Sequence, residues 1–396
     1  MSKERAYQTS HPWINFKLDL GGNTSYLLWL LLGAVESKCK HLAGIPLRPE
    51  KQQEINIISL RKGVHATTAI EGNSFSEDEV QRVIDNSQAG FSKSQEYQRK
   101  EVENVVKAYN NIVQEVDENG TCSADFCELM RDNLTIMDGL DLKQEVIPGR
   151  IRTHSVVVGK YRGAPAEDCE YLLDRFFKWI EEDWGMGNEH RVIEGILKAV
   201  IAHLYIAWIH PFGDGNGRSA RMLEFRLLMS ASVPLNAAHL LTSHYNDTRD
   251  EYYSALAAAS RGPNGNAAQF LHYALQGFKD ALDKQIDVIL AEQLNVTWKN
   301  YIHESAFKGP LTKAQTRERN LLLELSTFDG FIPLNELRRR LPGDVLAMYD
   351  GKTGRAFNRD INDLERRGLI IKKERSVSAA KQKMKAFLPI CRKDGL

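Results

Sequence analysis

The stretch Ala207–Arg221 has the sequence AWIHPFGDGNGRSAR, and it decides the fold that we expect around it. An apolar helical segment ends at His210, because the following proline disfavours helix. A glycine-rich turn comes next, and a new helix begins at Arg218. Backbone N–H groups in a Gly-Asn-Gly turn at the start of a helix form a cradle for an anion. The stretch therefore predicts two helices joined by a phosphate-binding turn.

The charged side chains around this turn suit the phosphates of a nucleotide. Arg218 and Arg221 are three residues apart on the second helix, and arginines donate forked, charge-assisted hydrogen bonds. Asp214 supplies one carboxylate, which suits Mg²⁺ when phosphate oxygens and water complete its coordination. His210 changes charge near neutral pH and is the natural general base. The stretch indicates phosphoryl or nucleotidyl transfer, and the alternative is a glycine-rich surface turn with exposed arginines.

The chain on both sides of this unit has mostly helical patterning. Ser76 is a good N-cap, with acidic residues in the first turn after it. We expect Phe212 to anchor the glycine-rich turn in the core. Helices are predicted at Tyr26–Cys39, Glu50–Gly72, Ser76–Asn86, Glu96–Asp117, Ser123–Met137, Ala166–Glu182, Arg191–Ile209, Arg218–Ser230, Arg249–Ala259 and Asn266–Lys299.

The stretch from His210 to Arg221 resembles the signature of the Fic family, H-x-F-x-[D/E]-G-N-G-R-x-x-R, with every specified position present. The resemblance covers about residues 20–300. Most Fic proteins transfer AMP from ATP to a hydroxyl side chain of a target protein. The resemblance therefore implies a protein adenylyltransferase that uses ATP and Mg²⁺ and also modifies itself. The expected fold is mainly α, with a Fic-type helical core and a short β-hairpin flap.

The resemblance also implies a role for each residue of the motif. His210 would deprotonate a Ser, Thr or Tyr hydroxyl of the target, and Asp214 would hold Mg²⁺ against the α- and β-phosphates. Attack at the α-phosphorus would release pyrophosphate, with positioning and charge neutralisation supplying most of the catalysis. The expected nucleotide-binding residues in this run are Gly215, Asn216, Gly217, Arg218, Ser219, Ala220 and Arg221.

A second motif, TTAIEG at Thr67–Gly72, precedes the core. Thr67 and Glu71 are four residues apart and share one face of a helix. Taken alone, this is an exposed helical glutamate before a glycine stop. It also resembles the inhibitory motif of Fic proteins, [S/T]-x-x-x-E-[G/N], which Thr67, Glu71 and Gly72 match. The resemblance implies that Glu71 pairs with Arg221, obstructs the γ-phosphate and makes the enzyme autoinhibited.

A third feature, HSVVVGKYR at His154–Arg162, is rich in β-branched residues and contains a glycine, which indicates a short strand or hairpin. It resembles the target-docking flap of the family, where a target segment could be added as a strand beside His210. A purely structural hairpin is the alternative. Ala164-Pro165 follows, whereas many family members have Pro-Pro at this place.

Aromatic residues after the motif are candidates for binding adenine, because stacking needs aromatic faces. Tyr245 and Tyr253 are the predicted adenine contacts, with Tyr252 and Tyr253 alternatively core residues of a helix. Some relatives carry an adenine-binding asparagine where this chain has Ser260, so that role is not carried over. His203 is expected to be a packed helix residue rather than a metal ligand.

The net charge of the chain is zero, with 52 Lys and Arg against 52 Asp and Glu, but it is unevenly distributed. From residue 311 onward there are 19 basic and 11 acidic residues, an excess of eight positive charges, and the rest of the chain carries the matching negative excess. The pattern of this tail is typical of an α+β winged helix. We predict helices at Ala314–Ser326, Pro333–Leu341 and Thr353–Arg367, a cap at Gly368, and strands at Leu369–Lys373 and Lys385–Pro389.

The basic tail has two interpretations that the sequence leaves open. As a DNA-binding module, it would use Arg355, Asn358 and Arg359 on its recognition helix, and basic residues of the wing would neutralise phosphates. As a protein module, it would serve partner contacts or dimerisation. With the DNA-binding interpretation, one alternative for the whole chain is a DNA-binding regulator whose Fic portion senses nucleotide. The family resemblance leaves another alternative, an enzyme that removes AMP from modified targets, which some family members do with the inhibitory glutamate. The basic residues of the wing are Lys372, Lys373, Arg375, Lys381, Lys383 and Lys385.

The length of 396 residues suggests two or three domains, at roughly 100–200 residues each. We expect an N-terminal helical region with the inhibitory helix at 1–110, the catalytic core and following helices at 111–300, and the winged helix at 311–396. The longest apolar run, Tyr26–Val35, is shorter than the roughly 20 residues that span a bilayer, so no membrane segment is expected. Because family members often form dimers, a homodimer is also considered.

The cysteines bear on the compartment. Cys39, Cys122, Cys127, Cys169 and Cys391 are odd in number and scattered, which is neither a disulfide framework nor a zinc pattern. A reduced cytoplasm is the simplest expectation.

Overall fold

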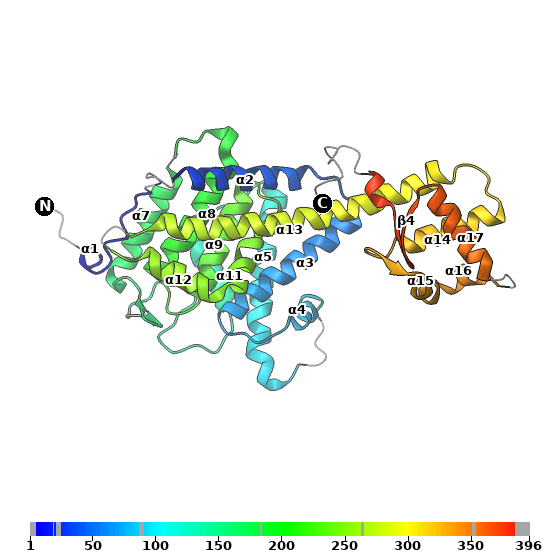
Figure 1. Cartoon of the computed structure of the whole chain (residues 1–396). Coiled ribbons are helices and arrows are strands. Elements are labelled where there is room, and N and C mark those ends of the chain that lie inside the picture. The colour runs from blue at the N-terminus through cyan, green and yellow to red at the C-terminus, as the bar shows by residue number, and fades with distance from the viewer. Residues whose placement is uncertain are drawn as a thin grey trace. The chain divides into compact units, whose positions relative to one another are not determined.

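The computed structural model describes residues 5–18, 20, 25–86, 91–182, 184–262, 265–350 and 354–384. The described residues are mainly helical, with one two-stranded and one three-stranded antiparallel sheet (Figure 1). The mainly α fold predicted from the sequence is confirmed. The chain divides into two compact units, Met1–Ile286 and Asp287–Leu396, and the division falls inside α13 (Ala267–Tyr301).

As far as its residues are described, unit 1 consists of helices and one hairpin, made by β1 (Val157–Val158) and β2 (Tyr161–Arg162). The helix predicted to begin at Arg218 begins two residues earlier, inside the glycine-rich turn. The helices are α1 (Ala6–Ser10), α2 (Ser25–Gly44), α3 (Pro49–Ile70), α4 (Glu77–Ile84), α5 (Glu96–Asn119), α6 (Phe126–Met137), α7 (Cys169–Glu181), α8 (Arg191–Ile209), α9 (Asn216–Ser230), α10 (Leu235–Ala238), α11 (Leu240–Asp247), α12 (Arg249–Ala259) and the first part of α13.

Helix α8 forms the centre of this unit, packed against α9, α7 and α2 (Figure 1). A helix that is apolar on all sides belongs in a core, and most residues of α8 are buried. By length and composition alone, Arg191–Ile209 could also cross a membrane, although 72% of its apolar 18-residue window is buried inside the structure. The expectation that no segment is long and apolar enough was wrong, because it counted only uninterrupted apolar runs and α8 contains isolated polar residues.

Local sequence explains where several helices begin and end. Ser76 caps α4 as predicted, since its hydroxyl accepts a hydrogen bond from the Glu79 backbone N–H at 3.3 Å. Asp125 caps α6 in the same way through Glu128 N–H. Helix α5 ends at Gly120, whose φ of 72° is the left-handed conformation that glycine adopts readily.

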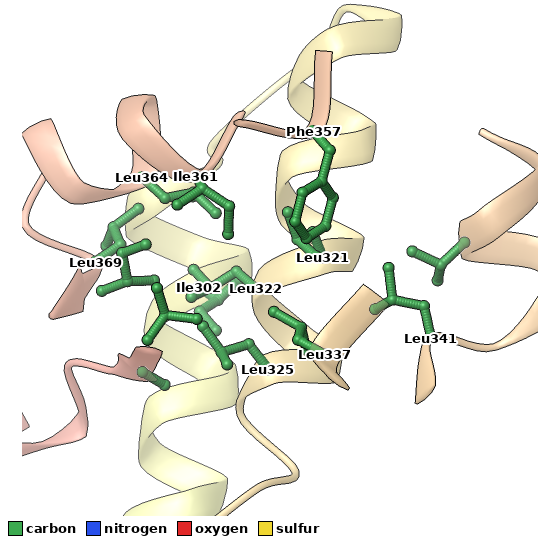
Figure 2. Packing of buried hydrophobic residues seen from close by; sticks show 14 of the residues in the cluster. Ile302, Leu321, Leu322, Leu325, Leu337, Leu341, Phe357, Ile361, Leu364 and Leu369 are labelled. Atoms are coloured by element: carbon green, nitrogen blue, oxygen red, sulfur yellow. The ribbon is translucent and has the colours of Figure 1, made fainter. Parts of the chain in front are cut away.

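Unit 2 surrounds one apolar core, to which Trp298 of α13 and Ile302 of the helical turn Ile302–Ala306 contribute. Figure 2 shows leucines of α14, α15 and the segment after α17 pointing toward one another, with Phe357 and Ile361 of α17 above them. The elements are α14 (Lys313–Leu325), β3 (Ile332–Pro333), α15 (Leu334–Arg340), α16 (Gly343–Ala347), α17 (Gly354–Arg366), β4 (Ile370–Lys373), β5 (Ser376–Ala379) and the short helix Lys381–Met384.

The strands of unit 2 differ from the prediction. The strand that pairs with β4 is β5 (Ser376–Ala379), which lies between the two predicted strands, Leu369–Lys373 and Lys385–Pro389. The chain turns tightly at Glu374, with a φ of 50°, and β5 lies between β3 and β4. The strand predicted at Lys385–Pro389, which includes Lys385, lies outside the described residues. Thr353 and Cys391 also lie outside them. Gly368, with a φ of 62°, ends α17 as predicted.

One buried ion pair joins two helices of unit 2. The guanidinium of Arg317 on α14 donates two hydrogen bonds to the Asp360 carboxylate on α17, and the Tyr349 hydroxyl donates to the same carboxylate at 2.9 Å. All three side chains are buried. The attraction between the two charges offsets the cost of burying them. Removing one partner would leave the other charge buried without compensation, which is strongly destabilising.

Candidate active site

Hydrogen bonds within the turn between α8 and α9 stabilise its conformation. His210 ends α8 with a left-handed backbone at φ 53°, and the Phe212 side chain after it is buried, as expected of an anchor. The Asn216 side chain accepts from Phe212 N–H and donates to Phe212 C=O, both at 2.8 Å. Phe212 also pairs with Ile151 through an isolated β-bridge. The amide of Asn216 therefore stabilises the turn, and only its backbone N–H remains for an anion.

Two glycines make room in this turn. Gly215, at φ 77°, precedes the first residue of α9, and a Cβ there would lie 2.6 Å from Met137 Sδ. A Cβ on Gly217 would lie 2.3 Å from a carboxylate oxygen of Glu71. The first N–H groups of α9 have no partner within the helix and lie at the positive end of its dipole. The beginning of α9 is therefore a cradle for negative charge.

The second arginine of the motif is already occupied. Arg221 Nε donates to Thr67 Oγ1 at 2.8 Å, and one terminal nitrogen donates to Glu71 Oε1 at 2.6 Å. The same nitrogen also contacts Thr67 C=O at 3.1 Å. Arg221 is 1% exposed, whereas the Glu71 side chain is 30% exposed. The structure thus joins the two motifs that the sequence places 150 residues apart.

The ionisation of Glu71 follows from its neighbours. Burial opposes a negative charge there, but the guanidinium groups of Arg221 and Arg218 outweigh it, so the pKa of Glu71 is below its ordinary value. The same pairing raises the pKa of Arg221 despite its burial. Glu71 and Arg221 therefore stay charged, and the pair stays intact, at all pH values near neutrality.

Arg218, another predicted nucleotide-binding residue, is buried, does not line the cavity and is held by two carboxylates. It donates to Glu101 of α5 at 2.6 Å and to Asp214 at 3.2 Å. Glu101 in turn accepts from the Asn73 side chain at 2.9 Å, just after the inhibitory motif. Neither Glu101 nor Asn73 was predicted from the sequence, since no local pattern marks them. The one signal was the need of a buried arginine for a carboxylate from another helix.

His210 is prepared to accept a proton. Its Nδ1 lies 3.3 Å from Ala207 C=O, and a carbonyl can only accept, so Nδ1 carries the proton of the neutral ring. Nε2 then keeps its lone pair. Burial lowers the pKa of His210 to about 4, because the hydrogen bond to Ala207 and the carboxylates of Glu71 and Asp214 only partly compensate, and the Arg152 cation also disfavours protonation. The ring is therefore neutral at physiological pH.

These groups meet in one cavity of about 660 Å³. His210, Asp214 and Arg221 line it, together with the backbone at the beginning of α9. Ser219 and Ala220, predicted as nucleotide contacts, do not line it, because the period of α9 turns both into the core. The predicted site residues on its wall are Glu71, His210, Asp214, Gly215, Asn216, Gly217, Arg221 and Tyr253.

The two tyrosines predicted to contact adenine have different surroundings. Tyr253 lines the cavity, is 45% exposed and donates a long hydrogen bond to Ile70 C=O at 3.3 Å. Tyr245 is fully buried, donates to Glu224 at 2.8 Å and does not line the cavity, so the structure does not bring it together with the other predicted site residues. Tyr252 and Ser260 also line the cavity. An aromatic residue for the base can therefore come from α12, and Tyr245 of α11 belongs to the core.

The predicted flap forms a wall of the same cavity. Val158 pairs with Tyr161 in a two-residue hairpin whose turn includes Gly159, at φ 58°. Val157 and Val158 are both exposed, whereas the Tyr161 hydroxyl donates to Trp208 C=O at 2.7 Å. Exposed strand edges can pair with another extended chain. The flap thus has one anchored strand and one strand with open side chains.

The carboxylates on the cavity wall suit a divalent cation whose other ligands are phosphate oxygens of a bound nucleotide and water. Among the described residues, no group of three or more His, Cys, Asp and Glu side chains could hold a metal by itself. Asp214 and Glu71 are the carboxylates on the described cavity wall, and Asp214 is half exposed beside the phosphate cradle. One carboxylate with phosphate oxygens and water is the coordination that Mg²⁺ accepts.

Fold and site together define a helical protein with a phosphate-binding turn, a neutral histidine and a buried arginine in one cavity. The family comparison agrees, since residues 122–228 match the Fic/DOC family model. The chain therefore carries a Fic domain.

Named relatives are similar to part of this chain. Protein adenylyltransferase fic-1 of Caenorhabditis elegans is 25% identical over 240 residues, 59% of this chain and 42% of that protein. Protein adenylyltransferase Fic of Nematostella vectensis is 30% identical over 138 residues, 33% of this chain and 30% of that protein. The chain thus spans less than half the length of these relatives.

Solved structures show the same fold. A Fic family protein from Desulfovibrio desulfuricans G20 aligns with a TM-score of 0.54 at 20% identity, covering 91% of this chain and 96% of that one. Fic-1 (residues 134–508) from C. elegans aligns with a TM-score of 0.50 at 22% identity, covering 68% and 74%. At these identities the likeness concerns the fold.

Proposed function

We propose that the chain is a protein adenylyltransferase that transfers AMP from ATP to a Ser, Thr or Tyr hydroxyl of a target protein, and to itself, and that Glu71 inhibits it. One observation carries the proposal. A neutral histidine, a phosphate cradle and an arginine occupied by Glu71 line the same cavity. The names of the relatives support AMP transfer in general.

The residues divide the chemistry between them. The target hydroxyl would lie against the flap, where His210 Nε2 accepts its proton. The freed oxygen attacks the α-phosphorus of ATP, the bond to the bridging oxygen breaks, and pyrophosphate leaves. Backbone N–H groups of Asn216 and Gly217 hold phosphate oxygens, and Arg221 binds the end of the triphosphate. When bound, Mg²⁺ neutralises phosphate charge, and Asp214 is the residue that would hold it.

Inhibition follows from competition for one guanidinium. In the structure Arg221 gives its hydrogen bonds to Glu71 and Thr67, so the γ-phosphate would meet a carboxylate where it needs a cation. Two negative groups a few ångströms apart repel strongly in a partly buried site. The triphosphate then binds out of line for attack.

Two substitutions test the activity. Full-length wild type, Glu71→Gly and His210→Ala are incubated with α-labelled ATP, Mg²⁺ and a cell lysate. We expect several-fold more labelled protein with Glu71→Gly than with the wild type, and none with His210→Ala. Label that survives in His210→Ala contradicts the mechanism, and equal label in wild type and Glu71→Gly contradicts the inhibition. Loss of label from a pre-modified protein that requires Glu71 would instead favour AMP removal.

A second candidate function concerns unit 2, which we propose to be a winged helix that binds DNA. The exposed face of α17 carries Arg355, Asn358 and Arg359, while Phe357 and Ile361 face the core. That arrangement suits a recognition helix whose N-terminal half contacts the major groove. Affinity of the full chain for duplex DNA should fall steeply with salt, and Arg359→Ala should lower the salt slope by about one. No binding to any duplex would favour a protein-binding role.

We also propose a reduced cytoplasm as the compartment and a homodimer as the assembly. The four cysteines that the structure describes are all free, and burial raises the pKa of Cys39, Cys122 and Cys169, which keeps these thiols protonated. Cys127 is the exposed thiol among them. Light scattering of the purified chain tests the assembly.

A further inference from the structure

Arg152 lies between α6 and β1 and takes no part in the motifs above. Its side chain is buried, with the residue 4% exposed, and it donates to four backbone carbonyls. Nε contacts His210 C=O at 2.7 Å, and one terminal nitrogen contacts His154 C=O at 2.6 Å. The other terminal nitrogen contacts Ala164 C=O, and Ile209 C=O at 3.4 Å. All four acceptors are neutral carbonyls, so this cation is held by geometry rather than by a carboxylate.

The positions of the four acceptors are informative. His154 and Ala164 lie at the two ends of the segment that contains the flap hairpin. Ile209 and His210 form the end of α8, directly at the proposed general base. One planar guanidinium therefore holds both bases of the flap and the last turn of the helix. Its fixed fork of five N–H donors makes such a junction possible in a single side chain.

Backbone contacts reinforce the junction. Arg152 N–H donates to Pro211 C=O at 2.9 Å, and Ala164 N–H donates to Ile209 C=O at 3.2 Å. Gly163 passes so close that a Cβ there would lie 2.7 Å from His210 Cβ. His210 itself has the left-handed φ that non-glycine residues adopt only when surroundings hold them there. The flap and His210 thus share one packed support.

We infer that Arg152 is a positioning residue that fixes the flap to the carbonyl of His210, so that a hydroxyl docked on the flap meets the histidine ring at a set distance. The functional part of this inference rests on the proposed adenylyl transfer. The structural part, that Arg152 holds the flap against the end of α8, does not depend on that function and can be tested without an activity assay.

The charge of Arg152 has a second effect on the same histidine. The groups that act on His210 are Arg152, which disfavours a proton on the ring, and the carboxylates of Glu71 and Asp214, which favour it. Burial is the larger cause of the low pKa of His210. Removing the Arg152 charge should therefore raise the pKa of His210 without restoring its ordinary value.

The experiment uses three variants of the full chain. Arg152→Gln removes the fork and the charge, and Arg152→Lys keeps the charge but loses the fork. Arg150→Gln is the matched control, since Arg150 is exposed two residues away. Hydrogen exchange of the Gly163 and Ala164 amides measures the joint. Histidine NMR, with the His210 signal assigned by His210→Ala, measures the pKa in the absence of nucleotide.

We expect both Arg152 variants to exchange these amides at least about tenfold faster, because charge-assisted hydrogen bonds are lost. The pKa of His210 should rise in Arg152→Gln only, and Arg150→Gln should change neither quantity. Unchanged exchange in folded Arg152→Lys and Arg152→Gln would overturn the inference. A separate outcome concerns the proposed function. If the amides exchange faster in the Arg152 variants but the Glu71→Gly protein, with Arg152 intact, labels nothing, then adenylyl transfer is refuted while the structural role of Arg152 is supported.

If Glu71→Gly labels proteins, the role of Arg152 in positioning the target hydroxyl is tested by combining Glu71→Gly with Arg152→Lys. Labelling of lysate proteins should fall while the affinity for a non-hydrolysable ATP analogue, measured by calorimetry, stays within about twofold. Equal losses of labelling and analogue affinity would contradict a role in positioning the target hydroxyl.

Discussion

Replacing Glu71 with glutamine should have two effects: it should free Arg221 to bind the γ-phosphate of ATP, and it should destabilise the protein. The substitution keeps the shape of the side chain but removes the charge opposite Arg221, which is 1% exposed. Breaking a buried pair by removing one partner costs about 3–5 kcal/mol. Here the cost should be lower, about 1–3 kcal/mol, because Glu71 is 30% exposed and Thr67 still accepts two hydrogen bonds from Arg221.

The loss can be measured by thermal unfolding. At roughly 2.1 cal/mol/K of unfolding entropy per residue, a unit the size of Met1–Ile286 loses roughly 1.7 °C of melting temperature per kcal/mol, so Glu71→Gln should melt roughly 2–5 °C below the wild type. Glu77→Gln is the matched control, because Glu77, whose side chain is 40% exposed, pairs with Arg61 at 3.2 Å near the surface, and surface pairs are worth about 0–1 kcal/mol.

Nucleotide should reverse the loss. Once Arg221 has no carboxylate partner, the γ-phosphate of Mg-ATP can take its place, and saturation at about 100 times Kd contributes about 2.7 kcal/mol. We therefore expect a larger ATP-induced rise in melting temperature for Glu71→Gln than for the wild type or Glu77→Gln. Equal melting temperatures without nucleotide, or equal rises with it, would refute the view that Glu71 and phosphate compete for Arg221.

Three further predictions concern other parts of the chain. Gly215→Ala should lower stability by about 1–3 kcal/mol and abolish ATP binding, measured by denaturant unfolding and calorimetry, because a Cβ would clash at a positive φ. In a Glu71→Gly background, labelling should have no acid limb near pH 6.5 and should fall only toward pH 4, because His210, whose pKa is lowered to about 4, is a neutral base above that value. An acid limb at pH 6–7 would show that the ring is solvated. Arg317→Met should destabilise unit 2 by about 3–5 kcal/mol, and adding Asp360→Leu should restore most of the loss, as seen by urea unfolding of the full chain.

The sequence predicted best the features that depend on near neighbours. The turn at His210–Gly217 was recognisable because its chemistry lies within a few residues, and the caps at Ser76 and Gly368 follow from local backbone needs. The pairing of Glu71 with Arg221 came from the family resemblance and is present in the structure. Its effect on activity stays a prediction.

The departures from the predicted arrangement have two physical causes. Ser219 and Ala220 were included because they lie in the motif, and their side chains lie in the core because residues between positions 218 and 221 of a helix point to other faces. Tyr245 was chosen by residue type, and type alone does not distinguish a stacking ring from a core ring with a satisfied hydroxyl. β5 was missed because basic residues surround its short apolar pattern.

Long-range partners were beyond reach for a different reason. Glu101 and Arg152 contact residues more than 50 positions away in the chain, and nothing in their immediate neighbourhood indicates those contacts. A buried arginine requires acceptors, but a sequence does not say whether a carboxylate or a set of carbonyls will supply them. Packing of α5 and of the flap segment against the motif settles that choice.

The self-bonded Asn216 side chain has a consequence for the thermodynamics of ligand binding. Because its two hydrogen bonds to Phe212 close the turn within the protein, the phosphate cradle exists before nucleotide arrives. A preorganised receptor loses little conformational entropy on binding, so little of the interaction energy is consumed in ordering the loop. Nucleotide association should then behave as docking to a rigid surface, with affinity differences among variants appearing mainly in dissociation rates.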